Sequence, residues 1–470
     1  MEDRRFTSID KLYQEQLSFK YEAKKIVASE RIDLLKKLKT TILHKENEIK
    51  KAIYKDFRKS PIETDTTEIL TSILEINHFI KNLKKWTEPK SVSSSLMFAS
   101  TSGKLIYEPK GNTLIITPWN YPFQLPIVHL VASIAAGNTA ILKLSEFTPH
   151  INSILKDIVS SVFPTKHVAV IEGEVDETTH LLSLKFDHIH FTGSPAVGKI
   201  IMQAASKNLT DITLELGGKS PVFVDKHINI KEVVKNLVWA KFINMGQTCI
   251  APDYLLVDKT IELEFDQAWK NEIKIAFGTN VEESEDLARI INAKQYERLE
   301  KYLQELKTSN AQWIVEGQND KETLFIHPTV VKNVPLDSSL MRNEIFGPIL
   351  PIIYYRDIKE ALEIVRNEEK PLALYIFSKN QAYKNLVLEN TTAGGTTIND
   401  AMVHIMHPQL PFGGVNNSGI GQSLGYYGFK SFSHERAVLN SRLFPMSKLF
   451  WYPYNNNTSK TLNFIKKLFT

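Results

Sequence analysis

One residue of the chain has the chemistry of a strong nucleophile. Cys249 is the only cysteine among 470 residues, and it lies in the segment Asn244-Met245-Gly246-Gln247-Thr248-Cys249. A single cysteine excludes an intramolecular disulfide, a four-sulfur zinc site and an iron–sulfur cluster. Free cysteine is usually a buried, inert packing group, but the residues before Cys249 make a polar, flexible approach. The pattern therefore favours a reactive thiol.

A carboxylate upstream of the thiol could serve as a general base. Glu215 ends the apolar segment 212–214 and is followed closely by Gly217 and Gly218, which allow a backbone to approach it. A carboxylate in such a place can take a proton from water if its pKa is suitable. Capping a helix or forming a salt bridge is the commoner role of a single glutamate, so the residues alone leave both roles open.

Two other segments could bind an oxyanion or a phosphate. Asn120 precedes Tyr121-Pro122, and it is either a turn residue or an amide donor. The segment Gly193-Ser194-x-x-x-Gly198 follows an apolar run and could open a helix whose free N–H groups face a pyrophosphate. The three-glycine dinucleotide spacing is absent, so by itself this segment predicts only a strand-to-helix turn.

Several longer motifs occur in one order along the chain. Taken together they resemble the aldehyde dehydrogenase superfamily over nearly the whole sequence. Lys59-Ser60-Pro61, followed by Glu63, is similar to the class 3 branch, which acts on aromatic and fatty aldehydes. The motifs are Thr117-Pro118-Trp119-Asn120-Tyr121-Pro122-Phe123, Phe191 to Gly198, Leu214 to Pro221, Asn244 to Pro252, Glu344-Ile345-Phe346-Gly347-Pro348 and Pro411 to Val415.

The resemblance implies roles for individual residues. Cys249 would be the nucleophile, Glu215 the base for thioester hydrolysis, and the Asn120 amide with the Cys249 backbone N–H would bind the oxyanion. The implied cofactor-binding residues are Thr117, Pro118, Trp119, Lys143, Glu146, Gly193, Ser194, Gly198, Leu216, Gly217, Glu344 and Phe346.

The implied cofactor is NAD, with NADP possible. Glu146 can accept hydrogen bonds from a ribose 2′-hydroxyl but repels a 2′-phosphate. Lys143 softens that preference for NAD, and Leu144 stands where the family usually has proline.

The expected reaction is oxidation of an aromatic, medium-chain or long-chain aldehyde to the acid. The alternatives are acyl transfer to coenzyme A, a catalytically silent binding or structural protein, and a redox sensor.

The elements that position these residues follow from length and pattern. A chain of 470 residues exceeds one hydrophobic core, so more than one domain is expected. Residues 29–86 have helical periodicity. Short apolar runs then alternate with helix-length segments, which predicts a doubly wound parallel α/β fold. The runs are at 113–116, 139–142, 168–171, 188–191 and 222–224, and a second alternating region covers 231–400.

The resemblance divides the chain into three parts: two doubly wound parallel-sheet domains and a small β oligomerisation element. A NAD-binding domain would comprise residues 1–91 and 108–215, and a catalytic domain residues 216–408. The oligomerisation element and C-terminal tail would comprise 92–107 and 409–470, in a homodimer.

Composition and the remaining motifs set further expectations. The net charge is +4, but the lysines are spread along the chain, so no nucleic-acid surface is expected. No leader peptide or membrane span is predicted, which favours a cytoplasmic protein. The histidine pairs His188/His190 and His404/His407 are expected to be structural, because neither has a third metal ligand nearby in the sequence.

The C-terminal tail, residues 446–470, combines aromatic and basic residues with an apolar stripe through Leu462, Ile465 and Phe469. It is predicted to pack on a partner subunit. The alternative is peripheral contact with the inner face of a membrane.

Overall fold

The first domain is built on a sheet whose five longer strands are all parallel. In the computed structural model, which describes residues 2–94, 98, 100–441 and 445–469, the strand order is β15-β7-β6-β3-β4-β5. Its strands are β3 (Asn112–Ile116), β4 (Thr139–Lys143), β5 (Val168–Ile171), β6 (His188–Gly193), β7 (Asp211–Leu216) and the short antiparallel β15 (Gly419–Ile420). The strands predicted at 113–116, 139–142, 168–171 and 188–191 are confirmed.

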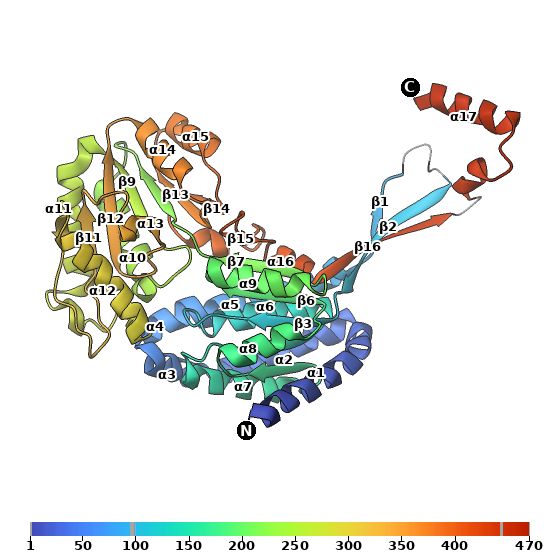
Figure 1. Cartoon of the computed structure of the whole chain (residues 1–470), viewed down its shortest axis with the longest axis horizontal. Helices are drawn as coiled ribbons and strands as arrows, with labels where there is room; N and C mark the ends of the chain where they lie inside the picture. The colour runs from blue at the N-terminus through green and yellow to red at the C-terminus, as the bar shows by residue number, and fades with distance from the viewer. Residues whose placement is uncertain (1, 95–97, 99, 442–444, 470) are drawn as a thin grey trace.

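Helices cover both faces of this sheet (Figure 1). Ile115 packs into one apolar core and its neighbours Leu114 and Ile116 into another, as expected of a strand buried on both faces. The helices are α1 (Glu2–Lys25), α2 (Ala28–His44), α3 (Glu46–Phe57), α4 (Pro61–Thr64), the π-helix η1 (Asp65–Ile69), α5 (Leu70–Thr87), α6 (Gln124–Ala136), α7 (Pro149–Val162), α8 (Val175–Ser183), α9 (Pro195–Ser206) and α16 (Gly425–Ser431).

The second domain has a seven-stranded sheet in the order β10-β11-β12-β9-β8-β13-β14. All neighbouring strands are parallel except β10 and β11. The strands are β8 (Pro221–Val224), β9 (Tyr254–Asp258), β10 (Gln312–Val315), β11 (Thr329–Lys332), β12 (Ile349–Tyr355), β13 (Ala373–Phe377) and β14 (Gly395–Ile398). The helices include α10 (Ile230–Phe242), α11 (Glu262–Phe277), α12 (Ala293–Lys307), α13 (Ser339–Arg342), α14 (Ile358–Asn367), α15 (Gln381–Asn390) and the short η3 (Ile243–Gly246), η4 (Lys259–Ile261), η5 (Val281–Glu283) and η6 (Val403–Met406).

The two sheets present opposite edges to the site. Asn120 follows the carboxyl end of β3, and Glu215 lies near the carboxyl end of β7. In the second domain Cys249 precedes the amino end of β9, and Glu344 precedes that of β12. In the first sheet the strand order reverses between β3 and β6, which is where ligands bind in open α/β sheets.

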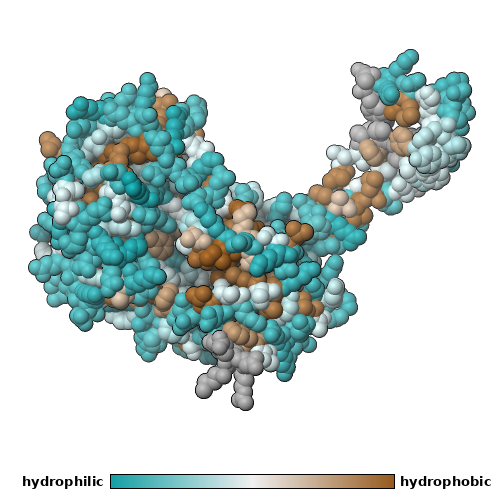
Figure 2. Space-filling view, in the orientation of Figure 1, coloured by the Kyte–Doolittle hydropathy of each residue, from teal (hydrophilic) through white to brown (hydrophobic). Residues whose placement is uncertain are grey.

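A long arm projects from the first domain (Figure 1). It is an antiparallel sheet of β1 (Lys90–Val92), β2 (Thr101–Pro109) and β16 (Ser433–Ser441), followed by η7 (Met446–Phe450) and α17 (Asn456–Phe469). Helix α17 contains Leu462 and Ile465 of the apolar stripe noted in the sequence. Apolar side chains are exposed along the arm (Figure 2), among them Leu439, Trp451 and Phe464. No helix in the described part of the chain is both long and apolar enough to cross a bilayer.

Candidate active site

The loop that carries the thiol has an unusual backbone. Three consecutive residues, Asn244, Met245 and Gly246, have positive φ angles of 51°, 54° and 72°. A left-handed conformation is unfavourable for a residue with a side chain, and a non-glycine residue there stores about 1–3 kcal/mol. A Cβ atom on Gly246 would collide with the backbone carbonyl of Gly347. The loop therefore holds this shape only because its surroundings impose it.

Hydrogen bonds from both domains hold this loop. The backbone N–H of Asn244 donates to Glu63 Oε1 at 2.8 Å, and its Nδ2 donates to the backbone oxygen of Asn120 at 2.8 Å. The Gln247 side chain donates to the backbone oxygen of Arg289 and accepts from the backbone N–H of Ile291, each at 3.0 Å. The loop is thus fastened to the first domain at one end and to the second at the other.

Asn120 faces the same loop. It is 3% exposed, and its Nδ2 donates to the backbone oxygen of Gln247 at 3.0 Å. A side-chain amide carries two N–H donors, so a second hydrogen remains for a ligand. Beside it, the hydroxyl groups of Tyr121 and Thr248 hydrogen-bond at 2.7 Å. These contacts fix the amide next to the loop of the thiol.

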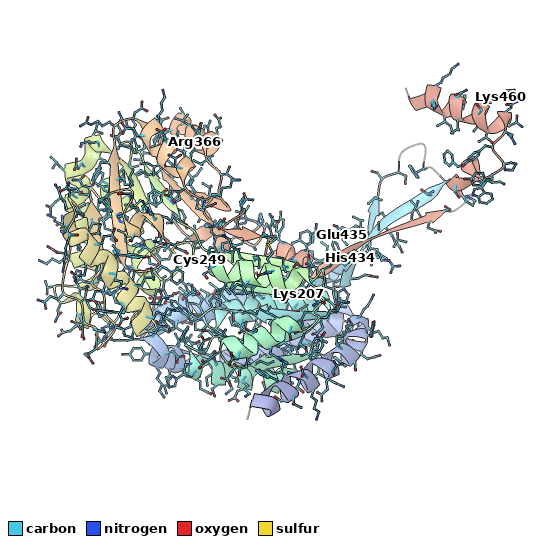
Figure 3. The ribbon with its side chains drawn as sticks, in the orientation of Figure 1. Lys207, Cys249, Arg366, His434, Glu435 and Lys460 are labelled. Atoms are coloured by element: carbon cyan, nitrogen blue, oxygen red, sulfur yellow. The ribbon has the colours of Figure 1, made fainter. Side chains whose placement is uncertain are left out.

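Cys249 is half-buried and lines a cavity between the two domains (Figure 3). Burial raises the pKa of its thiol, and the nearby carboxylates Glu344 and Glu215 raise it further. The backbone N–H groups of Cys249 and Ile250 oppose that shift in pKa. The neutral thiol is therefore the favoured form. A nearby base or a positive charge must assist formation of the thiolate.

Glu215 is a buried carboxyl group. It is 3% exposed, and burial raises its pKa to about 8, with a partial opposing effect from the Thr192 hydroxyl. Thr192 Oγ1 donates to Oε2 at 3.5 Å, Ser423 Oγ donates to Oε1, and His129 Nε2 lies 3.7 Å from Oε2. A carboxyl group with a pKa in this range can take up and release protons near neutral pH.

Glu344 lies on a second loop at the cavity. Burial and the charge of Asp253 raise its pKa to about 8, while the Gly218 N–H and Lys219 lower it. Asp253 also accepts from the backbone N–H of Ile345 at 2.8 Å. Because Gly217 has no Cβ, the Glu344 carboxylate can lie directly against it.

The segment predicted to bind a pyrophosphate opens helix α9. Ser194 is the N-cap of this helix, with Pro195 in its first turn. Gly193 and Ser194 line the cavity, whereas Gly198 packs under Leu216, so a Cβ on Gly198 would lie 2.7 Å from that side chain. The Ser194 hydroxyl accepts the Val197 N–H and the Ser194 carbonyl accepts the Gly198 N–H, so the Ala196 N–H and the positive end of the helix dipole are what this turn offers to an anion at the cavity wall.

Most of the predicted site residues meet at this cavity, which has a volume of about 1300 Å³. Trp119 and Phe346 pack edge to face across it, with ring centres 5.5 Å apart. The predicted residues that line it are Pro118, Trp119, Asn120, Gly193, Ser194, Glu215, Leu216, Gly217, Cys249, Glu344 and Phe346.

Four predicted residues do not line the cavity. Lys143 is 3% exposed, its Nζ donates to the backbone oxygen of Leu144 at 2.8 Å, and burial lowers its pKa. Glu146 is exposed on the loop after β4. Thr117 is buried after β3, and Gly198 lies inside α9.

The cavity continues into an apolar groove along helix α5. Leu70 and Leu74 lie one turn apart on that helix, and they are 45% and 48% exposed. Met406, on η6, is 48% exposed. Polar residues of α5, among them Thr71, Glu75 and His78, also line the groove, and the apolar groove residues are Leu70, Leu74, Trp239, Ile243, Met402, Val403, Ile405, Met406 and Leu424. No sequence pattern indicated them, because they come from four segments far apart in the chain.

A fully buried ion pair supports Asn120 from behind. Lys59 and Glu68 are both 0% exposed, with Nζ and Oε1 2.6 Å apart. Glu68 Oε2 also accepts the backbone N–H groups of Phe123 and Gln124, at 3.1 and 2.8 Å. In the sequence, Lys59 and Glu63 stand out only as part of a family motif. A lysine in an amphipathic helical region gave no signal that its charge is buried.

The histidine pairs differ in their surroundings. His188 Nδ1 lies 2.7 Å from Asp211 Oδ2, and His404 Nδ1 lies 3.0 Å from the Thr397 hydroxyl. His190 has no hydrogen-bond partner at either ring nitrogen within the described residues, and its ring centre is 3.7 Å from that of His129. His129, on helix α6, was not predicted from the sequence.

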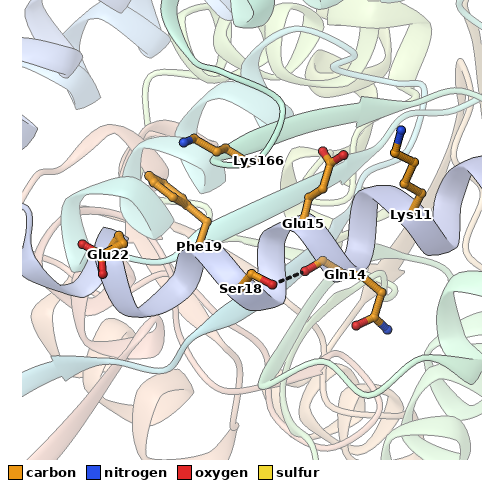
Figure 4. A pocket seen from close by; sticks show the side chains of 7 residues that line it. All are labelled: Lys11, Gln14, Glu15, Ser18, Phe19, Glu22 and Lys166. Carbon is orange, nitrogen blue, oxygen red and sulfur yellow. Dashed lines mark hydrogen bonds between the residues drawn. The ribbon is translucent and has the colours of Figure 1, made fainter.

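A second hollow lies on the surface of α1 (Figure 4). Its lining is mostly charged and polar, and Lys166 Nζ lies 4.7 Å from the ring centre of Phe19. It contains none of the predicted site residues and shares no lining residue with the cavity of Cys249.

The chain is similar to known proteins over most of its length. The model of the aldehyde dehydrogenase family matches residues 7–438. The chain is 42% identical over 409 residues to the 4,4'-diaponeurosporen-aldehyde dehydrogenase of Staphylococcus aureus, covering 87% of this chain and 88% of that protein. It is 40% identical over 409 residues to the dimeric NADP-preferring aldehyde dehydrogenase of Mus musculus, covering 87% and 89%. A solved structure titled as the substrate-bound state of Staphylococcus aureus AldH has a TM-score of 0.93 and 38% identity, covering 98% and 99%.

The buried ion pair gives a prediction for stability. Replacing Lys59 with methionine (Lys59→Met) leaves the Glu68 carboxylate buried without its counter-charge. We expect the free energy of unfolding to fall by about 3–5 kcal/mol, measured by urea denaturation with tryptophan fluorescence. Lys36→Met is the matched control, because Lys36 forms an exposed pair with Asp33, and it should change stability by about 0.5 kcal/mol or less. Equal effects of the two substitutions would contradict this assignment.

Proposed function

The chain belongs to the aldehyde dehydrogenase family, and on that premise we propose that Cys249 is acylated by the aldehyde during its oxidation to the acid. The enzyme is an oxidoreductase that acts on the aldehyde group. The observation that carries the proposal is the convergence of a thiol, a side-chain amide and a buried carboxyl group on one cavity, from Cys249, Asn120 and Glu215.

The first step is attack of the Cys249 sulfur on the carbonyl carbon. An aldehyde does not readily release hydride until a nucleophile makes its carbon tetrahedral, and a thiolate both attacks well and later leaves from a thioester. The thiol proton needs an acceptor, and Glu215 and Glu344 are the carboxylates close enough to influence its pKa. The oxygen that becomes negative would accept hydrogen bonds from the Asn120 amide and the Cys249 backbone N–H.

The residues at the cavity suit a nicotinamide dinucleotide. The opening turn of α9, with Ser194 as its N-cap, offers the Ala196 N–H and the positive end of the helix dipole to a pyrophosphate. Glu344, which lies against Gly217, would accept a ribose hydroxyl. When bound, the cofactor supplies the hydride acceptor.

We propose NAD as the cofactor, because Glu146 would repel a 2′-phosphate. NADP also remains a candidate, as a 40% identical mouse relative is named NADP-preferring.

Glu215 would then act as the base that releases the acid. Its carboxylate takes a proton from water, and the water oxygen attacks the thioester carbon, which frees the Cys249 sulfur. The raised pKa of Glu215 makes its carboxylate a stronger proton acceptor than an ordinary glutamate. An enzyme that passes the acyl group to coenzyme A has no need of this base, so the presence of Glu215 argues against that alternative.

This assignment predicts the behaviour of a Glu215→Gln variant. Glutamine keeps the size of the side chain but cannot accept the water proton. We expect the first equivalent of NADH to form still, because Glu344 is left to accept the thiol proton, whereas steady-state turnover falls by about 10²–10⁴-fold. Stopped-flow absorbance separates the two phases. Steady-state turnover that matches the wild type would rule out Glu215 as the base.

The apolar groove supports a long hydrophobic aldehyde as substrate. Leu70 and Leu74 offer apolar surface one turn apart along α5, beyond the thiol. The 42% identical Staphylococcus aureus relative is named 4,4'-diaponeurosporen-aldehyde dehydrogenase. We propose that medium-chain, long-chain or polyene aldehydes are preferred, with aromatic aldehydes as weaker substrates.

A substrate panel tests this preference. Across aliphatic aldehydes from three to sixteen carbons, kcat/KM should rise with length until the groove is filled. A Leu74→Gln variant should lose about 10–100-fold with the longest aldehyde, since burying one leucine side chain contributes about 1.5–3 kcal/mol. Its activity with propanal is the internal control, because propanal does not reach α5. No dependence on length, or equal losses for both substrates, would contradict the proposal.

The projecting arm supports a homodimer. Its exposed apolar residues include Leu439 at 61%, Trp451 at 54% and Phe464 at 66%, and an apolar surface of this kind usually marks an interaction site. The mouse relative is named as dimeric. We propose that the arm and α17 pack on a second copy of the chain, in a cytoplasmic enzyme.

Removal of residues 446–470 tests the role of the tail. If α17 packs on a partner subunit, neither the full-length nor the truncated protein should float with anionic lipid vesicles in a density gradient. Light scattering should show a dimer for the full-length chain and a weaker one after truncation. Flotation of the full-length protein alone would instead support the membrane contact.

A further inference from the structure

Three buried side chains meet directly behind the cavity wall. His129 comes from α6, His190 from β6 and Glu215 from β7, and they are 1%, 0% and 3% exposed. One ligating atom from each lies within 4.8 Å of the other two. Of the three, only Glu215 lines the cavity itself.

Both histidines contain ring nitrogens without a hydrogen bond. His129 Nε2 and both nitrogens of His190 have no hydrogen-bond partner within the described residues. Leaving a buried polar atom unpaired costs about 1–3 kcal/mol, so such atoms usually have a partner. His188 shows the contrast, because its Nδ1 lies 2.7 Å from Asp211 Oδ2 on the same face of the sheet. Unpaired nitrogens that converge on a carboxylate are what a small cation would satisfy.

The charge states of the cluster suit a cation. Burial lowers the pKa of His129 to about 3, and burial together with His129, His188 and Lys110 lowers the pKa of His190 well below its ordinary value. Both rings are therefore neutral and have a free lone pair, which is the form that binds metals. The Glu215 carboxyl group releases its proton as the cation binds, and its carboxylate then supplies the negative charge that a buried cation needs.

We propose that His129, His190 and Glu215 form an inhibitory binding site for a divalent transition cation of the zinc class. Two imidazole nitrogens and one carboxylate oxygen are a donor set that zinc accepts, whereas magnesium and calcium favour oxygen ligands. Three protein ligands leave a fourth position for water.

One observed distance already suits such an ion, and another requires a ring to move. His129 Nε2 and Glu215 Oε2 are 3.7 Å apart, and donor atoms around a tetrahedral zinc ion are roughly 3.4 Å apart. The two imidazole rings lie closer than in a bound site, with centres 3.7 Å apart against roughly 5 Å on one ion. One ring must therefore tilt away. His190 can do so without breaking a hydrogen bond, and the nearby Phe432 ring centre is 5.7 Å from its own.

Binding of this cation would stop the hydrolysis step. Glu215 would donate its lone pair to the ion and could no longer take a proton from water. The ion can arrive through the cavity, because Glu215 forms part of its wall. The inhibition rests on the proposed role of Glu215, whereas the metal site itself does not.

Equilibrium dialysis against zinc chloride, with the metal measured by mass spectrometry, tests the site without turnover. A Cys249→Ser background removes the thiol as a rival ligand. We expect one zinc ion per chain in this protein, and loss of that ion in Cys249→Ser/His190→Phe, where the phenyl ring keeps the packing against Phe432. Cys249→Ser/His129→Leu should lose it as well. Cys249→Ser/His167→Phe is the control, because His167 is buried elsewhere, between Phe19 and Phe163. This variant should bind zinc as the Cys249→Ser protein does.

The kinetic arm uses the enzyme with its thiol intact. Zinc should inhibit aldehyde oxidation reversibly, with activity restored by a chelator. His190→Phe should turn over without zinc as the wild type does, and should need at least about tenfold more zinc for half inhibition. Absence of zinc binding in Cys249→Ser, or equal binding in the His190→Phe double variant, would overturn the proposal. A wild type that oxidises no aldehyde would remove the proposed function but leave the dialysis result decisive.

Discussion

The site depends on hydrogen bonds that fasten one strained loop between two domains. The residues before Cys249 occupy left-handed backbone conformations, which the chain would leave if it were free. Glu63 and Asn120 hold the loop from the first domain, while contacts of Gln247 with residues 289 and 291 hold it from the second. Any relative movement of the domains would therefore act first on the position of the nucleophile.

Burial is the common cause of the electrostatics of the site. Glu215 and Glu344 both have their pKa raised to about 8, and the Cys249 thiol pKa is raised as well. Glu344 and Glu215 also disfavour the charged form of the Cys249 thiol, because all three groups line one poorly solvated cavity. A positive charge brought in by a cofactor, or a cation behind Glu215, would relieve that repulsion. The pKa values of these groups therefore depend on which charged ligand binds in or behind the cavity.

Much of the fold and several site residues could be predicted from the sequence. The parallel strands were predictable because both of their faces are buried, which produces short continuous apolar runs such as 113–116 and 168–171. Cys249 was predictable because it is the only thiol. The limits of the domains and the individual cofactor contacts remain predictions.

Other features depend on contacts that no local pattern encodes. Helix α6 is buried all round, so nothing in its sequence indicates that His129 faces β6. His188 and His190 alternate on one strand, but their different partners come from β7 and α6. Lys59 can be buried because its charge pairs with Glu68, which lies in the π-helix η1. The second sheet also presents its amino edge to the site, contrary to the usual rule for parallel sheets.

The most direct test of the account is the chemical capture of the acylated thiol. A reaction with a long-chain aldehyde and NAD is quenched in acid within its first turnover, and the digested protein is analysed by mass spectrometry. The account predicts that the peptide containing Cys249 gains the mass of the acyl group, and that a Cys249→Ala protein neither gains it nor reduces NAD. Acylation of another residue, or undiminished oxidation by Cys249→Ala, would contradict it.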